Sequence, residues 1–218
     1  MRKIFGHRGL PRIYKENTFT GINKAYEHCD FVEIDVRLTG DNQLILHHDP
    51  NIGEDLIKNL SLSELDILMK DGLIHDSILV SRDQIHGQVN FEIKTDTLDD
   101  SEVDILFQKM LSIFEPGDIV SSFNWKAIQS FKNLFNCNYG IIFDKEEDLF
   151  EAQALSNHDE ELFFMTHFSL IDSRNFALPK NKTVLWTVNN EDDFQRYMDM
   201  EIYGIVTDIP DTMQLYRK

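Results

Sequence analysis

The stretch FVEIDVRLTGDNQLILHHDP, residues 31–50, decides the fold. Its first eight residues alternate between apolar and charged side chains, which is the period of a β-strand. The run TGDN (39–42) is turn-forming and QLIL (43–46) has strand character, so we predict a β-hairpin. This hairpin interrupts a chain in which the other predicted strands lead into helices.

Eight short strand-like runs recur along the chain, and most of them open into a helical pattern. They are KIFGH (3–7), FVEIDVRL (31–38), VNFEIK (89–94), DIVSSF (118–123), YGIIF (139–143), ELFFMTH (161–167), TVLWTV (183–188) and YGIVT (203–207). Repeated strand–helix units favour parallel strands with helices outside, and eight units close a (β/α)8 or TIM barrel, an α/β fold. A doubly wound open sheet is the alternative, but GHRGLP (6–11) is not its usual G-x-G-x-x-G loop.

We expect residues 1–218 to form a single domain, because no repeat, linker or low-complexity tract divides them. The hairpin begins a small insertion over about residues 40–88, between the second and third barrel strands. Within it, SLSELDILMK (61–70) has a helical pattern, and Ser61 and Glu64 have the spacing of a capping box.

Composition and charge exclude several classes of partner. The hydrophobic content of 42% is ordinary for a globular protein, but the net charge of −17 would repel nucleic-acid backbones. No apolar run is long enough to cross a membrane, and MRKIFGHRG (1–9) turns polar too soon for a signal peptide. We therefore expect a cytoplasmic protein with no nucleic-acid partner and no membrane insertion. The sequence predicts no oligomeric state.

Charged residues concentrate where three predicted strands end, and in a barrel these ends form the active face. They are His7 and Arg8, Glu33 and Asp35, and Glu92 and Lys94. Parallel barrel strands have no solvated face, so charges that point inward need partners. Three carboxylates beside one lysine and one arginine leave an excess of negative charge. We predict a divalent metal, Mg2+ or Ca2+, held by the three carboxylates.

The hairpin decides whether His47 or His48 faces these carboxylates. If the turn is centred in the middle of TGDN, Leu46 pairs with Asp35 and His48 pairs with Glu33. Directly paired residues share a face of the sheet, so His48 would point to the carboxylates and His47 away. A slip of one residue would reverse this prediction.

Two imidazoles beside a hard metal suit an acid and a base better than two further ligands. Cleaving a phosphodiester requires one group to take a proton from the attacking oxygen and another to give one to the departing oxygen. We predict His7 and His48 for these roles, without assigning which is the acid. Arg8 and Lys94 would stabilise the charge on the phosphate oxygens.

Eight motifs occur in an order that resembles the glycerophosphodiester phosphodiesterase family, from Gly6 to Pro210. They are GHRG, ENT, EIDVRLTGD, HDP, FEIK, SFN, WTVN and GIVTDIP. The resemblance implies a metal-dependent TIM-barrel hydrolase that converts small-molecule glycerophosphodiesters to glycerol 3-phosphate and an alcohol. Matched position by position, it implies catalytic His7 and His48, metal ligands Glu33, Asp35 and Glu92, and substrate or phosphate contacts Arg8, Lys94, Asn17 and Trp186.

Some positions depart from the family pattern. Lys15 stands where the family usually has proline before ENT, and NIGEDLIKN (51–59) replaces the usual continuation of HDP. The resemblance therefore supports the reaction better than it identifies the departing alcohol. His167 also ends a predicted strand and could reach the pocket. For Asp208, in TDIP, a helix cap is at least as good a reading as a place in the site.

Two alternatives to the hydrolase stay open. The first is a lyase in which the substrate's own hydroxyl attacks phosphorus and a cyclic phosphate is released. The sphingomyelinase D toxins resemble this pattern, but they are secreted and disulfide-bonded, whereas Cys29 and Cys137 read as reduced packing residues. The second is a non-catalytic module that binds phosphodiesters, which would require a missing catalytic group.

Overall fold

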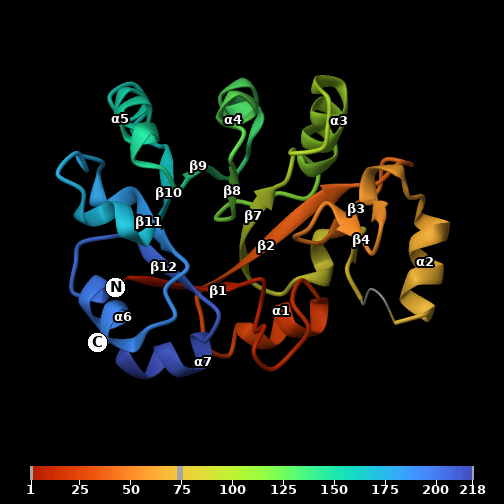
Figure 1. The fold of residues 1–218 in the computed structure, drawn as a ribbon, viewed down its shortest axis with the longest axis horizontal. Helices are drawn as coiled ribbons and strands as arrows, with labels where there is room; N and C mark the ends of the chain where they lie inside the picture. Colours follow the sequence, from red (N-terminus) through yellow and green to blue (C-terminus); the bar gives the residue numbers. More distant parts are fainter. Residues whose placement is uncertain (1, 73–75, 218) are drawn as a thin grey trace.

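A closed barrel of parallel strands is the centre of the protein in a computed structural model, which describes residues 2–72 and 76–217. Within these residues, eight strands close the ring because β1 pairs with both β2 and β12 (Figure 1). They are β1 (Lys3–His7), β2 (Phe31–Leu38), β7 (Gln88–Ile93), β8 (Ile119–Ser122), β9 (Asn138–Phe143), β10 (Phe163–His167), β11 (Thr183–Trp186) and β12 (Gly204–Thr207). The predicted TIM barrel is confirmed.

Helices lie outside the ring and connect its strands (Figure 1). The α-helices are α1 (Phe19–Ala25), α3 (Asp100–Met110), α4 (Trp125–Phe131), α5 (Leu149–Ser156), α6 (Glu191–Met198) and α7 (Pro210–Met213). Short 3-10 segments are η3 (Lys132–Leu134), η4 (Glu146–Asp148), η5 (Phe168–Asp172), η6 (Lys180–Lys182) and η7 (Gln214–Tyr216). The connection that follows β10 begins with η5 in place of an α-helix.

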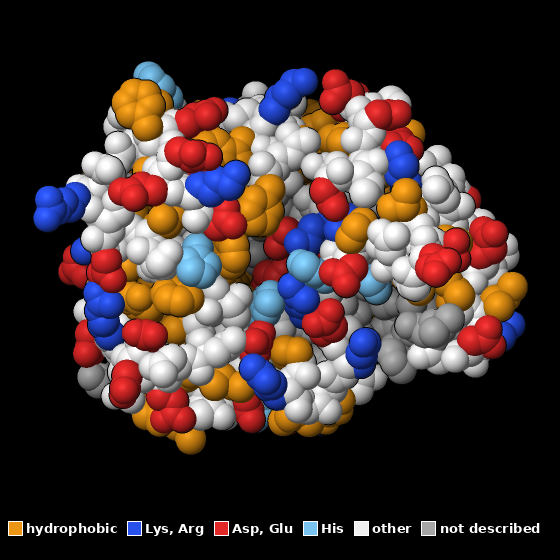
Figure 2. Space-filling view, viewed as in Figure 1, with side chains coloured by type: hydrophobic (Ala, Val, Ile, Leu, Met, Phe, Trp, Pro, Cys, Tyr) orange, Lys and Arg blue, Asp and Glu red, His pale blue; other side chains and the backbone are white. Residues whose placement is uncertain are grey.

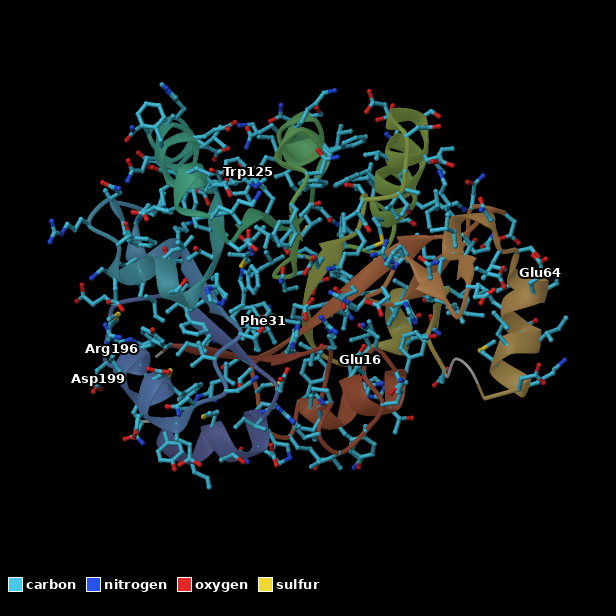
Figure 3. The ribbon with its side chains drawn as sticks, in the orientation of Figure 1. Glu16, Phe31, Glu64, Trp125, Arg196 and Asp199 are labelled. Atoms are coloured by element: carbon cyan, nitrogen blue, oxygen red, sulfur yellow. The ribbon has the colours of Figure 1, made fainter. Side chains whose placement is uncertain are left out.

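Apolar side chains fill the inside of the barrel beneath the strand ends. Phe5 and Phe31 stack with ring centroids 4.6 Å apart, and Phe31 is labelled near the middle of the ring in Figure 3. Ile119, Ile142, Phe163, Met165, Val184 and Val206 complete this cluster. A second, larger set of apolar residues packs between the strands and the outer helices. The interior below the mouth is therefore a packed apolar core.

The hairpin is present, but its predicted register was wrong by one residue. Strand β3 (Leu44–Leu46) runs antiparallel to β2, with Leu46 opposite Val36 and not opposite Asp35. The Thr39 amide donates to the Gln43 carbonyl, and Asn42 has a φ of 60°. These features define a loop of three residues, 40–42, whose last residue has a left-handed backbone conformation. The loop is one residue longer than the two-residue turn that the prediction assumed.

The remainder of the insertion lies at one side of the barrel (Figure 1). It contains β4 (Asn51–Ile52), β5 (Asp55–Leu56), η1 (Ile57–Asn59), α2 (Leu62–Lys70), β6 (Ile78–Leu79) and η2 (Arg82–Gln84). Strand β6 pairs with β3 and so extends the sheet outward. The Ser61 hydroxyl caps α2 and Glu64 completes the capping box, as predicted.

A buried ion pair ties the end of the insertion to the floor of the barrel, opposite the mouth. Arg82 donates from Nε and Nη2 to Asp118, just before β8, over 3.0 and 2.9 Å. The same guanidinium donates to the carbonyls of Ile85 and Gly87. Asp118 is 1% exposed, and it also accepts the Val89 amide at the start of β7. This pair sets where the chain re-enters the ring.

Candidate active site

A cavity of about 240 Å3 opens at the C-terminal ends of the barrel strands. One wall is charged and comes from His7, Arg8, Glu33, His48, Glu92 and Lys94. Most of the remaining lining is apolar and comes from Phe123, Ile142, Met165, Trp186 and Val206. Figure 2 shows acidic, basic and histidine side chains gathered around a hollow near the middle of this face. Seven of the nine predicted site residues line this cavity.

Three carboxylates from neighbouring strands meet at the charged part of the lining. Glu33 and Asp35 lie on β2 and Glu92 on β7, and Asp35 and Glu92 are register partners. One oxygen from each lies within 4.8 Å of the others. Among the described residues, Glu33 Oε1 is buried and has no hydrogen-bond partner. Three clustered carboxylates, one of which has an oxygen without a hydrogen bond, fit the oxygen ligands that a hard divalent cation such as Mg2+ or Ca2+ prefers.

The carboxylates are not equivalent electrostatically. Burial, followed by the charge of Asp35, raises the pKa of Glu33 to about 8. Burial acts in the same direction on Asp35, but Lys94 and Arg8 outweigh it and lower its pKa to about 2. Lys94 Nζ lies 3.0 Å from Asp35 Oδ1, and Arg8 Nε lies 3.2 Å from Asp35 Oδ2. The two cations therefore compensate Asp35 first and leave Glu33 undercompensated.

The loop after β1 adopts an unusual backbone to bring its groups to the site. Arg8 has a φ of 54° and Gly9 a φ of 98°, a region that most side chains avoid. At Gly9 a Cβ would lie 2.9 Å from the carbonyl carbon of Gly21, so a side chain would not fit. In this conformation the Arg8 amide donates to Glu33 Oε2 over 3.1 Å. Such backbone strain is typical of functional sites.

Asn17 lies behind the cavity and not in its wall. Its Nδ2 donates to Asp35 Oδ2 over 2.9 Å, while its Oδ1 accepts the Asp35 amide over 3.1 Å. The residue is 2% exposed and adopts a φ of 55°. This geometry fits a residue that holds Asp35 in place more closely than the predicted contact with a phosphate.

Both candidate imidazoles use Nδ1 to bind an aspartate. His7 Nδ1 lies 2.6 Å from Asp208 Oδ1, and His48 Nδ1 lies 2.8 Å from Asp49 Oδ1. Because a carboxylate only accepts, each imidazole donates through Nδ1 and leaves Nε2 for the site. His7 Nε2 is 3.8 Å from Glu33 Oε2. Burial lowers the pKa of His7, but Asp208 and Glu33 outweigh burial and raise it.

His48 lines the cavity for a different reason from the one predicted. Strand β3 ends at Leu46, two residues before His48. The alternation of side chains along that strand therefore does not determine where His48 points. Instead, Arg37 donates from Nε and Nη2 to the His48 carbonyl over 3.0 and 2.6 Å. Arg37 is 4% exposed and also binds Asp96 over 2.8 Å. His47 is not among the residues lining the cavity, and its Nδ1 donates to the Asp49 carbonyl.

Asp208 does not cap the last helix, although a helix cap was at least as good an interpretation of TDIP as a place in the site. The N-cap of α7 is Ile209, and no side chain caps that helix. Asp208 instead binds His7, and Asn189 Nδ2 donates to its other oxygen over 2.6 Å. His167 is not among the residues lining the cavity and contacts the Trp186 ring at 5.6 Å between centroids.

A second cavity of about 430 Å3 adjoins the first and shares His48, Glu92, Lys94 and Phe123 with it. Its other lining residues include Arg37, Asp49, Thr95, Asp96, Ser122 and Asn124, together with Pro50 and Ile93. The Phe123 and Trp186 rings meet edge to face at 6.0 Å.

Comparisons with known proteins identify the family to which the chain is similar. A family model described as the glycerophosphoryl diester phosphodiesterase family matches residues 7–212. A glycerophosphodiester phosphodiesterase of Caldanaerobacter subterraneus subsp. tengcongensis is 27% identical, over 99% of this chain and 98% of its own length. Another, from Bacillus altitudinis, is 23% identical over 97% of this chain and 96% of its own.

Solved structures share the barrel. A phosphodiesterase from Oleispira antarctica, in complex with the product sn-glycerol-3-phosphate, superposes with a TM-score of 0.78 at 20% identity, covering 99% of this chain and 96% of its own. A glycerophosphodiester phosphodiesterase from Thermotoga maritima gives a TM-score of 0.75 at 22% identity, covering 100% and 99%. Among the described residues of this chain, no helix is long and apolar enough to cross a membrane.

Proposed function

The chain belongs to the glycerophosphoryl diester phosphodiesterase family and is a hydrolase of glycerophosphodiesters, and on this premise we propose how its residues perform the reaction. Water attacks phosphorus, the bond to the departing alcohol breaks, and glycerol 3-phosphate and the alcohol are released. One of His7 and His48 takes the proton of the water and the other gives a proton to the leaving oxygen. Residues 1–218 act as one domain in this proposal.

The observation that supports the proposal most strongly is the convergence of both imidazoles on one cavity. His7 comes from β1 and His48 from the loop that follows the hairpin, and both line the space that Glu33, Glu92 and Lys94 also line. Each imidazole has its Nδ1 occupied by an aspartate, so each has Nε2 available for proton transfer. Two oriented imidazoles around one small space are what acid–base cleavage requires.

We assign the remaining residues from their contacts. Glu33, Asp35 and Glu92 would hold the divalent metal, which when bound would supply positive charge to the non-bridging phosphate oxygens. Arg8 and Lys94 line the same wall and would add charge-assisted hydrogen bonds to those oxygens. Trp186 would form the apolar wall against the substrate. Asn17 would keep Asp35 oriented.

A substrate panel tests the proposal. The purified protein is stripped with EDTA and incubated with glycerophosphoethanolamine, glycerophosphoinositol and bis(glycero)phosphate, without metal and with Mg2+ or Ca2+. We expect glycerol 3-phosphate only in the metal-containing samples. Absence of turnover on the entire panel would contradict the substrate class. Phosphorus NMR would reveal a cyclic phosphate if the enzyme were a lyase.

Neighbouring histidines provide a matched pair of variants. We expect His48→Ala to lower kcat by about 10²–10⁴, the range for losing a general acid or base. His47→Ala removes the same chemical group from the adjacent position, where Nδ1 donates to a backbone carbonyl, and should retain most activity. Equal losses in the two variants would contradict the assignment of His48.

A further inference from the structure

Asp208 reaches His7 because the barrel closes. Strands β1 and β12 are neighbours, with Gly6 opposite Thr207, so the residues that follow each pair lie side by side. Asp208 Oδ1 accepts the Nδ1–H of His7 over 2.6 Å, at 21% and 22% side-chain exposure. This bond leaves Nε2 as the ring nitrogen on the cavity side, 3.8 Å from Glu33 Oε2.

Asp208 is itself held by a neighbouring amide. Asn189 Nδ2 donates to Asp208 Oδ2 over 2.6 Å, so both carboxylate oxygens are engaged. Asn189 Oδ1 accepts the Asp208 amide over 2.8 Å and the Thr207 hydroxyl over 3.1 Å. These bonds give the Asn189 amide one orientation, because its oxygen must face two donors and its nitrogen must face the carboxylate.

The partner of His48 is held differently. Asp49 is adjacent to His48 in the chain, and its side chain is 72% exposed. A hydrogen bond this exposed competes with water and constrains the ring weakly. The His7–Asp208–Asn189 arrangement is therefore the more rigid of the two.

We propose that Asp208, oriented by Asn189, is the positioning residue of His7: it fixes the Nδ1–H tautomer and the ring plane so that Nε2 faces the phosphodiester. The inference rests on the proposed function of the site. A carboxylate behind an imidazole accepts a hydrogen bond from the ring and so stabilises the tautomer that carries the proton on Nδ1. An amide whose NH2 group faces the ring instead requires Nδ1 to accept a hydrogen bond.

The Asn189 contacts make a specific prediction for Asp208→Asn. Asn189 Nδ2 needs an acceptor, so the new amide must turn its oxygen to Asn189 and its NH2 group to His7. His7 Nδ1 must then accept, and the proton moves to Nε2. The exchange variant Asp208→Asn/Asn189→Asp reverses this demand, because residue 189 now accepts the NH2 group and the amide oxygen returns to His7.

Kinetics with glycerophosphoethanolamine and Mg2+ form the first arm of the test. We expect Asp208→Asn to lower kcat about 100-fold with little change in KM, between the roughly tenfold loss of a supporting contact and the 10⁴-fold loss of a triad aspartate. The exchange variant should recover at least about tenfold of that loss. Asp144→Asn is the control, because Asp144 follows β9 at the same barrel rim, is exposed, and should leave kcat unchanged.

NMR of 15N-histidine-labelled protein forms the second arm and needs no turnover. Because Asp208 and Glu33 raise the pKa of His7, the spectra are recorded on the high-pH plateau of its titration, where the ring is neutral. There we expect the Nδ1–H tautomer of His7 in the wild type, Nε2–H in Asp208→Asn, and Nδ1–H again in the exchange variant. An unchanged tautomer in Asp208→Asn would overturn the inference even if kcat falls. If the wild type is inactive on the substrate but the tautomer switches, the proposed function fails and the positioning role stands.

Discussion

Neutralising Glu33 should stabilise the metal-free protein, although Glu33 is a proposed metal ligand. Its carboxyl group is 4% exposed, one of its oxygens has no hydrogen bond among the described residues, and Asp35 lies beside it. Glu33→Gln keeps the shape of the side chain and removes the charge. The variant should therefore gain stability in EDTA while it loses the response to metal.

The pKa of Glu33 sets the size and the sign of this effect. Folding raises it from 4.5 to about 8, so the folded state prefers the protonated form. The stability of the wild type should therefore fall as the pH rises through this window, and level off above it. The raised pKa corresponds to a cost of about 1 kcal/mol at pH 5 and about 4 kcal/mol at pH 8. Glu33→Gln has no ionisable group at this position, so this cost is absent from the variant.

Urea unfolding followed by tryptophan fluorescence, in EDTA at pH 5, 6, 7 and 8, measures the difference. The advantage of Glu33→Gln should grow by about 3 kcal/mol between pH 5 and pH 8. Glu160→Gln, an exposed change of the same type, should stay within about 0.5 kcal/mol of the wild type. An advantage that does not grow with pH would refute the reasoning that Glu33 is an uncompensated buried charge.

Metal should offset much of the stability that Glu33→Gln gains over the wild type. A divalent cation at 100 times its dissociation constant stabilises the folded state by about 2.7 kcal/mol. We expect Mg2+ or Ca2+ to raise the unfolding free energy of the wild type by an amount of this order. Glu33→Gln should lose most of the increase, because one of three donor carboxylates is gone. Equal metal stabilisation of both proteins would place the cation elsewhere.

Two further predictions concern buried arginines. Arg82→Met leaves Asp118 buried without its ion pair, so the free energy of unfolding measured in urea should fall by about 3–5 kcal/mol, while kcat stays unchanged. A loss below about 1 kcal/mol would contradict the role of this pair. Arg37→Met removes both donors to the His48 carbonyl, so kcat should fall roughly tenfold, the size of loss seen when a residue that orients a site residue is changed. An unchanged kcat would mean that the loop after β3 holds His48 in place without Arg37.

The barrel and its carboxylates could be predicted from the sequence because their signals are local. Strand runs such as YGIIF (139–143) are apolar over a few residues, and each is followed by a helical pattern. Glu33 and Asp35 share a face because side chains alternate within one strand. Glu92 joins them because its strand is the next parallel neighbour of β2.

The hairpin register could not be predicted in the same way. TGDN is compatible with a turn of two residues or a loop of three, and the backbone of Asn42 decides between them. The position of His48 then depends on Arg37, whose guanidinium captures the His48 carbonyl after the strand has ended. Neither contact has a signature in the spacing of the residues, so His48 was placed in the cavity by incorrect reasoning about parity.

The position of Asp208 beside His7 could have been predicted from the pairing of the first and last strands of a closed barrel. In a closed eight-stranded barrel the last strand must pair with the first, and Gly6 lies opposite Thr207, so the residue after β12 must lie near the last residue of β1. That places Asp208 beside His7, although 201 positions separate them in the chain. A cap would have needed its side chain at Ile209, immediately before Pro210, and Asp208 comes one residue too early. Where the first strand of such a barrel ends in a histidine, an acid at the end of the last strand should first be tested as its partner.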